Sequence, residues 1–370
     1  MSKQLTTTRQ ERGEAIAKLD NQIKRIDANT YMVKSQSGNG VYEVLKASIG
    51  WMCQCPDHIY RGVTCKHIHA VLVSLSLRAE VAIRRIKPIE NFTECIYCGS
   101  RNIRKDGKRK NKSGTLQIYE CKDCHKYFTF NIGFERMKHN PQAITSAMQL
   151  YFSGESLRNT MKSLKLLGVE VSHQTVYNWI KKYTRLMRDY AEKLKPNVSD
   201  TWRADEVYVK IKGNMKYLFA MMDDETRFWI AQEVAETKQK HDARTLFMRS
   251  KYLMGKQPKV LITDGLPSYA KACEWAFDGT KHIRKITLKG KVNNNNKMER
   301  LNGEIRDREK TMRGLKRRRT TILQGIQIYH NFIREHEGLN GKTPAEACGI
   351  KVEGKNKWLT LIRNASLNNS

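Results

Sequence analysis

Apolar and polar residues alternate along several stretches of the chain, and this period of two predicts β-strands. Near the N-terminus, the stretches 23–34 and 41–46 flank a Ser-, Gly- and Asn-rich segment, which predicts two strands joined by a turn. After residue 200 the pattern predicts five strands, at 202–211, 215–222, 228–234, 259–264 and 282–288. Short polar turns join the first three as antiparallel hairpins. A helical pattern at 241–254 predicts a crossover to a parallel fourth strand.

Helical spacing dominates residues 138–196 and predicts three helices, 141–152, 156–167 and 173–183, with Ser172 as an N-cap. Three short helices with a polar last one favour a helix-turn-helix, whose third helix enters the major groove of DNA. On that helix we expect base contacts from His173, Gln174, Thr175 and Asn178, phosphate contacts from Lys181 and Lys182, and core positions at Val176, Trp179 and Ile180. A plain helical bundle is the alternative.

The ends of the chain carry weaker patterns. Residues 1–20 are polar and predict a loose arm or a short helix. A helix is expected at 324–337, and Thr343 and Glu346 have the spacing of a capping box around Pro344, which predicts a further helix start. The tail after Lys357 is polar, and we expect it to fray.

Seven of the nine cysteines fall between Cys53 and Cys124. Four soft ligands, Cys53, Cys55, Cys65 and His67, suit a tetrahedral zinc site, and a second site is predicted from two Cys-x-x-Cys pairs, Cys95, Cys98, Cys121 and Cys124. The alternative is a set of buried cysteines. The second set encloses seven Lys/Arg between residues 101 and 112, which favours a phosphate-binding ribbon over a merely solvated hairpin. Cys273 and Cys348 stand alone and are interpreted as small buried side chains.

The formal net charge is +31. A polyanionic partner explains such an excess, since neutralising phosphates releases counterions. An anionic membrane surface is the alternative, but the sequence has no apolar run of about 18 residues. Its N-terminus has no apolar signal core either.

The excess of positive charge is greatest in residues 281–320, which contain fifteen Lys/Arg and four acidic residues. Bound DNA would relieve the repulsion along this segment, whereas the alternative is a solvated helix. We expect four of its basic residues to contact DNA: Arg300, Arg306, Arg308 and Lys310.

Three acids have a pattern typical of two-metal phosphoryl transfer. Asp205 lies in a predicted strand, and Asp264 ends another. Thirty-four residues separate Asp264 from Glu299, which lies near the start of a basic helix. Carboxylates from such elements can hold two Mg²⁺ ions about 3.5–4 Å apart. Taken singly, each acid is more often a solvated surface group. The neighbouring acids Asp223, Glu304 and Glu309 are competing candidates.

The motifs around these acids resemble the core of insertion-sequence DDE transposases, of the group numbered six. They are Asp205-Glu-x-Tyr-x-Lys-x-x-Gly213 with Tyr217-Leu218 and Asp223, Thr263-Asp-Gly-x-x-Ser-Tyr269, Asn295-Asn-x-x-Glu-Arg300 and Met312-Arg-Gly314. The resemblance implies a ribonuclease-H-like α/β core, a mixed five-stranded sheet with helices, in which Asp205, Asp264 and Glu299 bind Mg²⁺ or Mn²⁺. It selects Glu299 as the third acid, because the family places that acid after the Asn-Asn pair.

The resemblance also implies an activity and an organisation. We expect binding of terminal inverted repeats, 3′-end nicking and strand transfer by at least a dimer in a prokaryotic cytoplasm, at the nucleoid. The rivals are a catalytically silent DNA-binding regulator and a structure-specific nuclease. The first cysteine set resembles a SWIM-type zinc finger, which departs from compact members of the group. The expected regions are 1–85 (SWIM-type module), 90–135 (zinc ribbon), 138–196 (helix-turn-helix), 200–350 (catalytic) and 351–370 (tail).

Overall fold

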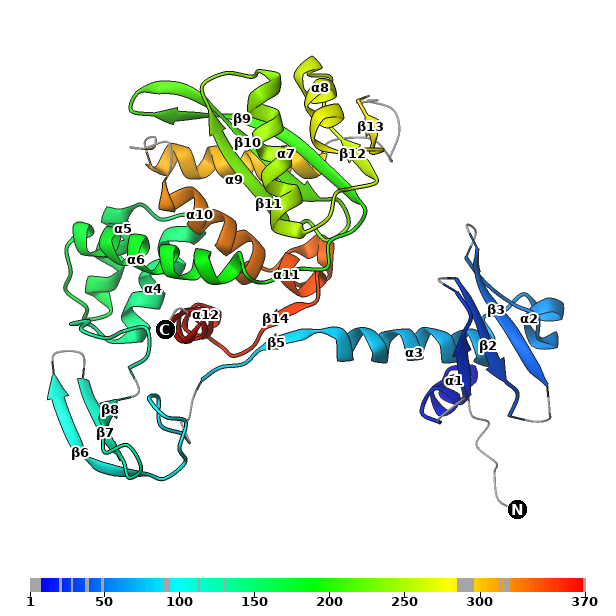
Figure 1. Cartoon of the computed structure of the whole chain (residues 1–370), viewed down its shortest axis with the longest axis horizontal. Helices are drawn as coiled ribbons and strands as arrows, with labels where there is room; N and C mark the ends of the chain where they lie inside the picture. Colours follow the sequence, from blue (N-terminus) through cyan, green and yellow to red (C-terminus); the bar gives the residue numbers. More distant parts are fainter. Residues whose placement is uncertain are drawn as a thin grey trace. The chain divides into compact units, whose positions relative to one another are not determined.

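The computed structural model divides the chain into two compact units, Met1–Ile83 and Arg84–Ser370 (Figure 1). It describes residues 8–19, 22–27, 29–36, 40–47, 50–89, 94–111, 114–129, 131–284, 296–312, 315 and 320–368, without the side chains of 76–82 and 111. Among these residues, no helix has the length and apolar character needed to cross a membrane.

The first unit is an antiparallel sheet flanked by helices. Its strands are, in order, β1 (Ile23–Arg25), β2 (Thr30–Lys34), β3 (Val41–Ala47) and β4 (Gly50–Cys53), and its helices are α1 (Arg9–Ala17), α2 (Pro56–Arg61) and α3 (Lys66–Ala82). The prediction of one strand at 23–34 is wrong. The Asp27 carboxylate accepts hydrogen bonds from the backbone N–H groups of Asn29 and Thr30, at 2.7 and 2.8 Å, and this turn splits the stretch into a hairpin.

The second unit begins with a short strand and a three-stranded ribbon. Strand β5 (Arg84–Ile86) pairs in parallel with β14 (Ile350–Val352) near the other end of the chain. The ribbon strands are β6 (Ile103–Asn111), β7 (Gly114–Cys121) and β8 (Tyr127–Thr129), paired in that order. Their small core contains Cys95, Cys121 and Phe128.

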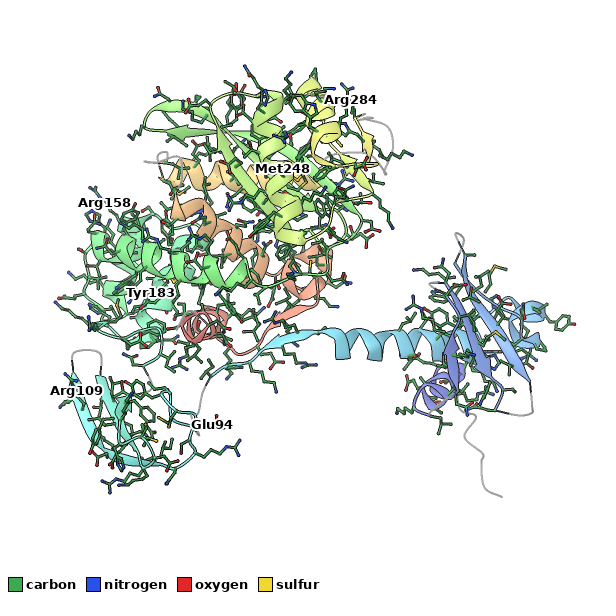
Figure 2. All side chains as sticks on the ribbon, viewed as in Figure 1. Glu94, Arg109, Arg158, Tyr183, Met248 and Arg284 are labelled. Carbon is green, nitrogen blue, oxygen red and sulfur yellow. The ribbon has the colours of Figure 1, made fainter. Side chains whose placement is uncertain are left out.

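Three helices follow the ribbon: α4 (Pro141–Ser153), α5 (Leu157–Leu166) and α6 (His173–Ala191). The predicted N-cap is confirmed, since Oγ of Ser172 accepts a hydrogen bond from the Thr175 backbone at 3.1 Å. The predicted core positions Val176, Trp179 and Ile180 are buried. Helix α6 runs beyond its predicted end at Tyr183, which is labelled in Figure 2, because the buried Met187 and Tyr190 continue its apolar stripe.

The five predicted strands after residue 200 form one mixed sheet. They are β9 (Thr201–Ile211), β10 (Asn214–Asp223), β11 (Trp229–Ala235), β12 (Val260–Ile262) and β13 (Lys281–Ile283), in the order β11-β10-β9-β12-β13. The first three are antiparallel, and β12 is parallel to β9 after the crossover helix α7 (Lys240–Met254). This order confirms the predicted ribonuclease-H-like core. Residues 285–288 of the last predicted strand lie outside the described residues, as do Asn295, Arg313 and Gly314 of the motifs.

Helices cover both faces of this sheet. Figure 1 shows α7 on one face and α9 (Asn296–Met312) on the other. Helix α8 (Pro267–Ala276) packs against α7. One continuous hydrophobic core joins the sheet to α4, α5 and α6.

The C-terminal region is more ordered than expected. Its elements are α10 (Thr321–Ile328), a π-helical turn (Tyr329–Ile333), a 3-10 turn (Glu337–Leu339), α11 (Pro344–Ala347), β14 and α12 (Lys357–Leu367). The predicted capping box at Thr343 and Glu346 is confirmed. The predicted frayed tail is wrong. Trp358, Leu361 and Ile362 share one face of α12 and are buried against α4 and α6.

Candidate active site and metal centres

Asp205 and Asp264 lie level with one another on neighbouring strands. The parallel register pairs Ile262 of β12 with Arg203 of β9. Asp264 lies two residues after Ile262, and Asp205 lies two residues after Arg203, so the two aspartates stand side by side. Parallel strands run about 4.8 Å apart. One carboxylate oxygen of each of Asp205, Asp264 and Glu206 lies within 4.8 Å of the other two.

The Asp205 carboxylate is held by two donors. Its Oδ1 accepts a hydrogen bond from the Glu206 backbone, and its Oδ2 accepts one from Nδ2 of Asn302 on α9, both at 2.9 Å. Burial, with the charges of Glu206 and Asp264 next, raises the pKa of Asp205 to about 7. Burial also raises the pKa of Asp264, and the Glu206 charge adds to it. A divalent cation between these oxygens would remove the repulsion.

Glu299 is close to this pair without joining it. It is exposed on the first turn of α9, three residues before Asn302, and its charge contributes to the raised pKa of Asp205. Among the described residues, the carboxylate cluster contains Glu206 and not Glu299. The structure therefore brings two of the three predicted acids together and places the third on the adjoining helix.

Glu206 is the acid that the sequence prediction omitted. Its Oε1 accepts from Nζ of Lys238 at 2.8 Å, and its Oε2 accepts from the hydroxyl of Tyr269 at 2.7 Å. It immediately follows Asp205, so strand alternation sends its side chain to the opposite face. The sequence feature that could have drawn attention to Glu206 is the Ser-Tyr pair after Asp264, because Tyr269 of this pair donates a hydrogen bond to Glu206.

The competing acids have structural partners instead. Asp223 is fully buried and accepts from the Ser199 backbone at 2.8 Å and the Thr226 backbone at 2.9 Å. Glu304 pairs with Arg334 at 2.6 Å. Glu309 accepts a hydrogen bond from the backbone N–H of Lys210. These contacts account for the positions of the three acidic side chains without a bound metal ion.

The predicted DNA contacts on α9 divide by helical face. Arg300, Arg306 and Lys310 are exposed, whereas Arg308 is 7% exposed and its guanidinium carbon lies 5.0 Å from the ring centre of Tyr151. Arg308 therefore departs from the prediction. It follows Glu299 by nine residues, which at about 100° per residue points it to the opposite face.

On α6, the predicted groove residues begin at the exposed N-terminal turn. His173, Gln174, Asn178 and Lys182 are exposed, and Thr175 and Lys181 are half-buried. Nε2 of Gln174 donates to Oδ1 of Asn178 at 3.2 Å. Nζ of Lys181 lies 5.1 Å from the ring centre of Tyr177. The polar face is thus available to solvent, as a groove-binding helix requires.

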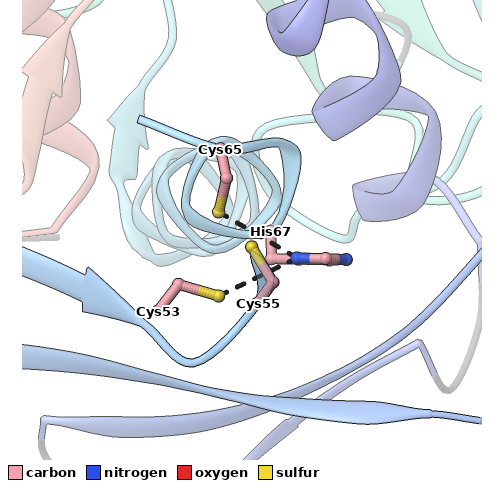
Figure 3. Close-up of side chains that lie close together, drawn as sticks. All are labelled: Cys53, Cys55, Cys65 and His67. Carbon is pink, nitrogen blue, oxygen red and sulfur yellow. Dashed lines mark hydrogen bonds between the residues drawn. The ribbon is translucent and has the colours of Figure 1, made fainter. Parts of the chain in front are cut away.

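The first cysteine set converges in the N-terminal unit. Figure 3 shows Nδ1 of His67 facing Sγ of Cys53, at 3.8 Å, and Sγ of Cys65, at 4.0 Å, with Cys55 beside them. All four side chains are buried. A hydrogen bond from Cys53, the largest cause, lowers the pKa of Cys65 to about 3, and the thiolate is the form that binds zinc. The nearby His58 lies outside this set, and its Nδ1 is 2.8 Å from the Val63 carbonyl oxygen.

The second cysteine set converges in the ribbon. Sγ of Cys95 lies 3.6 Å from Sγ of Cys124, and Sγ of Cys98 lies 3.6 Å from Sγ of Cys121. All four are free thiols rather than disulfides. Sulfur atoms at this separation fit the tetrahedral shell of one zinc ion, in which each Zn–S bond is about 2.3 Å.

Comparison with known proteins points to one family for the catalytic region. Residues 199–336 match the family model DDE_Tnp_IS240, described as a DDE domain. The transposase for insertion sequence-like element IS431mec of Staphylococcus aureus is 32% identical over 139 residues, which cover 36% of this chain and 60% of that protein. An uncharacterized 48.3 kDa protein of insertion element ISM1 from Methanobrevibacter smithii is 26% identical over 199 residues, covering 49% of this chain and 47% of that protein. The chain thus spans 60% or less of the length of these relatives.

Solved structures with a similar arrangement include retroviral integrase cores. The HTLV-2 integrase catalytic core domain in complex with magnesium is 19% identical, with a TM-score of 0.32, over 42% of this chain and 98% of that one. The BIV integrase core is 14% identical, with a TM-score of 0.29, over 40% of this chain and 93% of that one. Residues 199–336 of this chain are therefore similar to a DDE domain, and a stretch of 139 residues is similar to a transposase of an insertion sequence-like element.

Proposed function

We propose that this protein is the transposase of an insertion element, which nicks the 3′ ends of the element and joins them to target DNA. The observation that carries the proposal is the level placement of Asp205 and Asp264 on adjacent parallel strands, with the Glu299 helix hydrogen-bonded to Asp205 through Asn302. The curated relatives from Staphylococcus aureus are named as transposases of insertion elements, which supports the same activity.

Asp205, Asp264 and Glu299 are the residues we assign to divalent metal binding. The donor set fits, because carboxylate oxygens suit Mg²⁺ or Mn²⁺. Burial, and after it the charge of Glu206, raises the pKa values of both aspartates, and a cation would stabilise their charged forms. Bound metal ions would supply activation of the attacking oxygen and stabilisation of the leaving oxygen. The chain's own task is positioning. Strand β9 carries Asp205, Asp264 follows the end of β12, and the first turn of α9 carries Glu299.

DNA binding is assigned to two surfaces. The polar face of α6, with His173, Gln174, Thr175 and Asn178, would read the terminal inverted repeats, and Lys181 and Lys182 would contact phosphates. The exposed Arg300, Arg306 and Lys310 on α9 would hold DNA near the acids. The two cysteine sets would each bind one structural zinc ion. Because both element ends must be held together, the active species would be at least a dimer.

The decisive experiment is strand transfer in vitro. The full-length protein, Mg²⁺ and a labelled duplex bearing the repeats that flank its gene are incubated with target plasmid, alongside Glu299→Gln and Asp264→Asn. Joined products from the wild type alone would support the proposal and the third ligand together. Cleavage without joining would favour a structure-specific nuclease. Salt-sensitive DNA binding without any chemistry would favour a silent regulator.

A further inference from the structure

Glu206 is buried in the active site but faces away from the helix that carries Glu299. In the β9–β10 register Glu206 stands opposite Phe219, and Asp205 stands opposite Ala220. Adjacent strand residues point to opposite faces, so Asp205 reaches Asn302 on α9 while Glu206 reaches Tyr269 on α8. The Glu206 side chain is 5% exposed.

Both oxygens of Glu206 are already engaged. Lys238 pairs with one at 2.8 Å and Tyr269 donates to the other at 2.7 Å. The Lys238 ammonium is itself fixed, since it lies 5.0 Å from the ring centres of both Tyr208 and Tyr217. A carboxylate whose two oxygens already accept from a lysine and a tyrosine is suited to hold the residues around a metal site in place.

Tyr269 connects Glu206 to the segment that carries Asp264. It lies five residues after Asp264, in the first turn of α8, and is fully buried. Its ring stacks on Phe247 of α7, with ring centres 5.9 Å apart. The hydrogen bond from Tyr269 to Glu206 therefore ties the start of α8 to strand β9, on which Asp205 stands.

We propose that Glu206, Lys238 and Tyr269 form a positioning unit that sets the distance between Asp205 and Asp264 and thereby the affinity of the site for divalent metal. Lys238 neutralises the charge of Glu206 and so reduces the repulsion between Glu206 and the two aspartates. Glu206 can then hold the aspartates in position. Glu206 itself is a positioning residue and not a metal ligand. The inference deepens the proposed function, because it concerns the metal site on which that function rests.

The test is Mn²⁺ binding to the full-length, DNA-free protein, followed by electron paramagnetic resonance of the free ion. Tyr269→Phe keeps the buried ring and removes only the hydroxyl, and we expect it to weaken Mn²⁺ binding about tenfold. Lys238→Met should weaken binding in the same direction. Asp264→Asn, a ligand variant, should abolish binding. Tyr252→Phe, at a tyrosine of α7 that is 84% exposed, is the matched control and should bind as the wild type does.

A second measurement separates positioning from general loss of structure. Thermal unfolding without Mn²⁺ identifies any variant that fails to fold. For folded variants, DNA cleavage is followed against Mn²⁺ concentration. Positioning variants should need about tenfold more Mn²⁺ for half-maximal rate and recover near-wild-type rates at saturation, whereas Asp264→Asn should not recover.

The outcomes for the inference and for the proposed function are distinct. Wild-type Mn²⁺ affinity in both Tyr269→Phe and Lys238→Met, or no Mn²⁺ binding by the wild type, would overturn the positioning unit. Loss of binding in Glu206→Gln with normal binding in Tyr269→Phe would make Glu206 a ligand and overturn it too. Weakened Mn²⁺ binding in the variants, together with a wild type that never joins DNA, would support the positioning unit and refute the transposase proposal.

Discussion

Nδ2 of Asn302 donates a hydrogen bond of 2.9 Å to Oδ2 of Asp205, and Asn302 lies one helical turn beyond Glu299 on α9. The contact joins the helix of the third acid directly to the first acid. Asn302 is 3% exposed, so this hydrogen bond is made away from bulk water. Removing it would free both the carboxylate and the helix that carries Glu299.

We therefore predict that Asn302→Ala lowers metal-dependent DNA cleavage about 10- to 100-fold, the usual cost of losing a group that orients a metal ligand. Nicking of a repeat-bearing plasmid would measure the effect. Asp307→Ala, at an exposed residue of the same helix that pairs with Lys310 at the surface, should cleave normally. Equal activity of Asn302→Ala and wild type would show that the contact is dispensable.

The stability of the metal-free protein should depend on pH through Asp205. Its pKa is raised from 3.8 to about 7, first by burial and then by Glu206 and Asp264. The folded state therefore holds a proton that the unfolded state has released, and its stability falls as the pH rises through this window. The change should be on the order of 1–3 kcal/mol.

Thermal unfolding between about pH 4.5 and 7.5, in buffer without Mg²⁺ or Mn²⁺, measures this dependence. Asp205→Asn cannot ionise, so its unfolding temperature should decline less over the same range. Adding Mg²⁺ should raise the wild-type unfolding temperature more at the upper end, where the carboxylates are free to bind it. An identical pH profile for the wild type and Asp205→Asn would contradict the assignment.

Two arginines of α9, two residues apart, should behave in opposite ways. Arg306 is exposed on the same face as Glu299, so Arg306→Ala should lower the salt dependence of DNA binding by about one phosphate contact and leave folding unchanged. Arg308 is buried against Tyr151 of α4, so Arg308→Ala should destabilise the fold by about 1–2 kcal/mol and leave the salt slope unchanged.

DNA affinity measured across a series of salt concentrations, with thermal unfolding in parallel, distinguishes the two roles. Each variant serves as the control for the other, since both remove one positive charge from the same helix. A weaker dependence of DNA affinity on salt concentration in Arg308→Ala would indicate that Arg308 contacts DNA.

Local chemistry in the sequence predicted much of this structure. The N-cap at Ser172, the capping box at Thr343 and the alternation of the strands depend on neighbouring residues, and all of them are present. Asp205 and Asp264 could be paired because a parallel crossover brings the ends of two strands together. The clustering of the cysteines and His67 follows equally from short-range spacing.

The missed features depend on packing between distant segments. Glu206 acquires its role from Tyr269, 63 residues later, and from Lys238, 32 residues later. Arg308 was expected at the surface because it carries a charge, but its guanidinium lies over the ring of Tyr151. The turn at Asp27 arises from a side chain that competes with strand hydrogen bonding.

The C-terminal helix should be essential for stability, although its sequence resembles a polar tail. Trp358 is 3% exposed, and its ring stacks on Phe152 of α4 and Tyr329, while its indole N–H donates to Gln149 at 2.9 Å. Replacing such a buried indole leaves a cavity and an unpaired acceptor. Trp358→Ala should cost about 3–5 kcal/mol in the free energy of unfolding.

Urea denaturation of the full-length protein would measure this cost. Leu367→Ala is the matched control, because Leu367 lies on the last turn of the same helix and is 42% exposed, so its loss should change stability by less than about 0.5 kcal/mol. Since α12 packs against both α4 and α6, destabilisation by Trp358→Ala should also weaken DNA binding near the unfolding midpoint. A wild-type unfolding curve for Trp358→Ala would show that residues 357–367 are not part of the folded core.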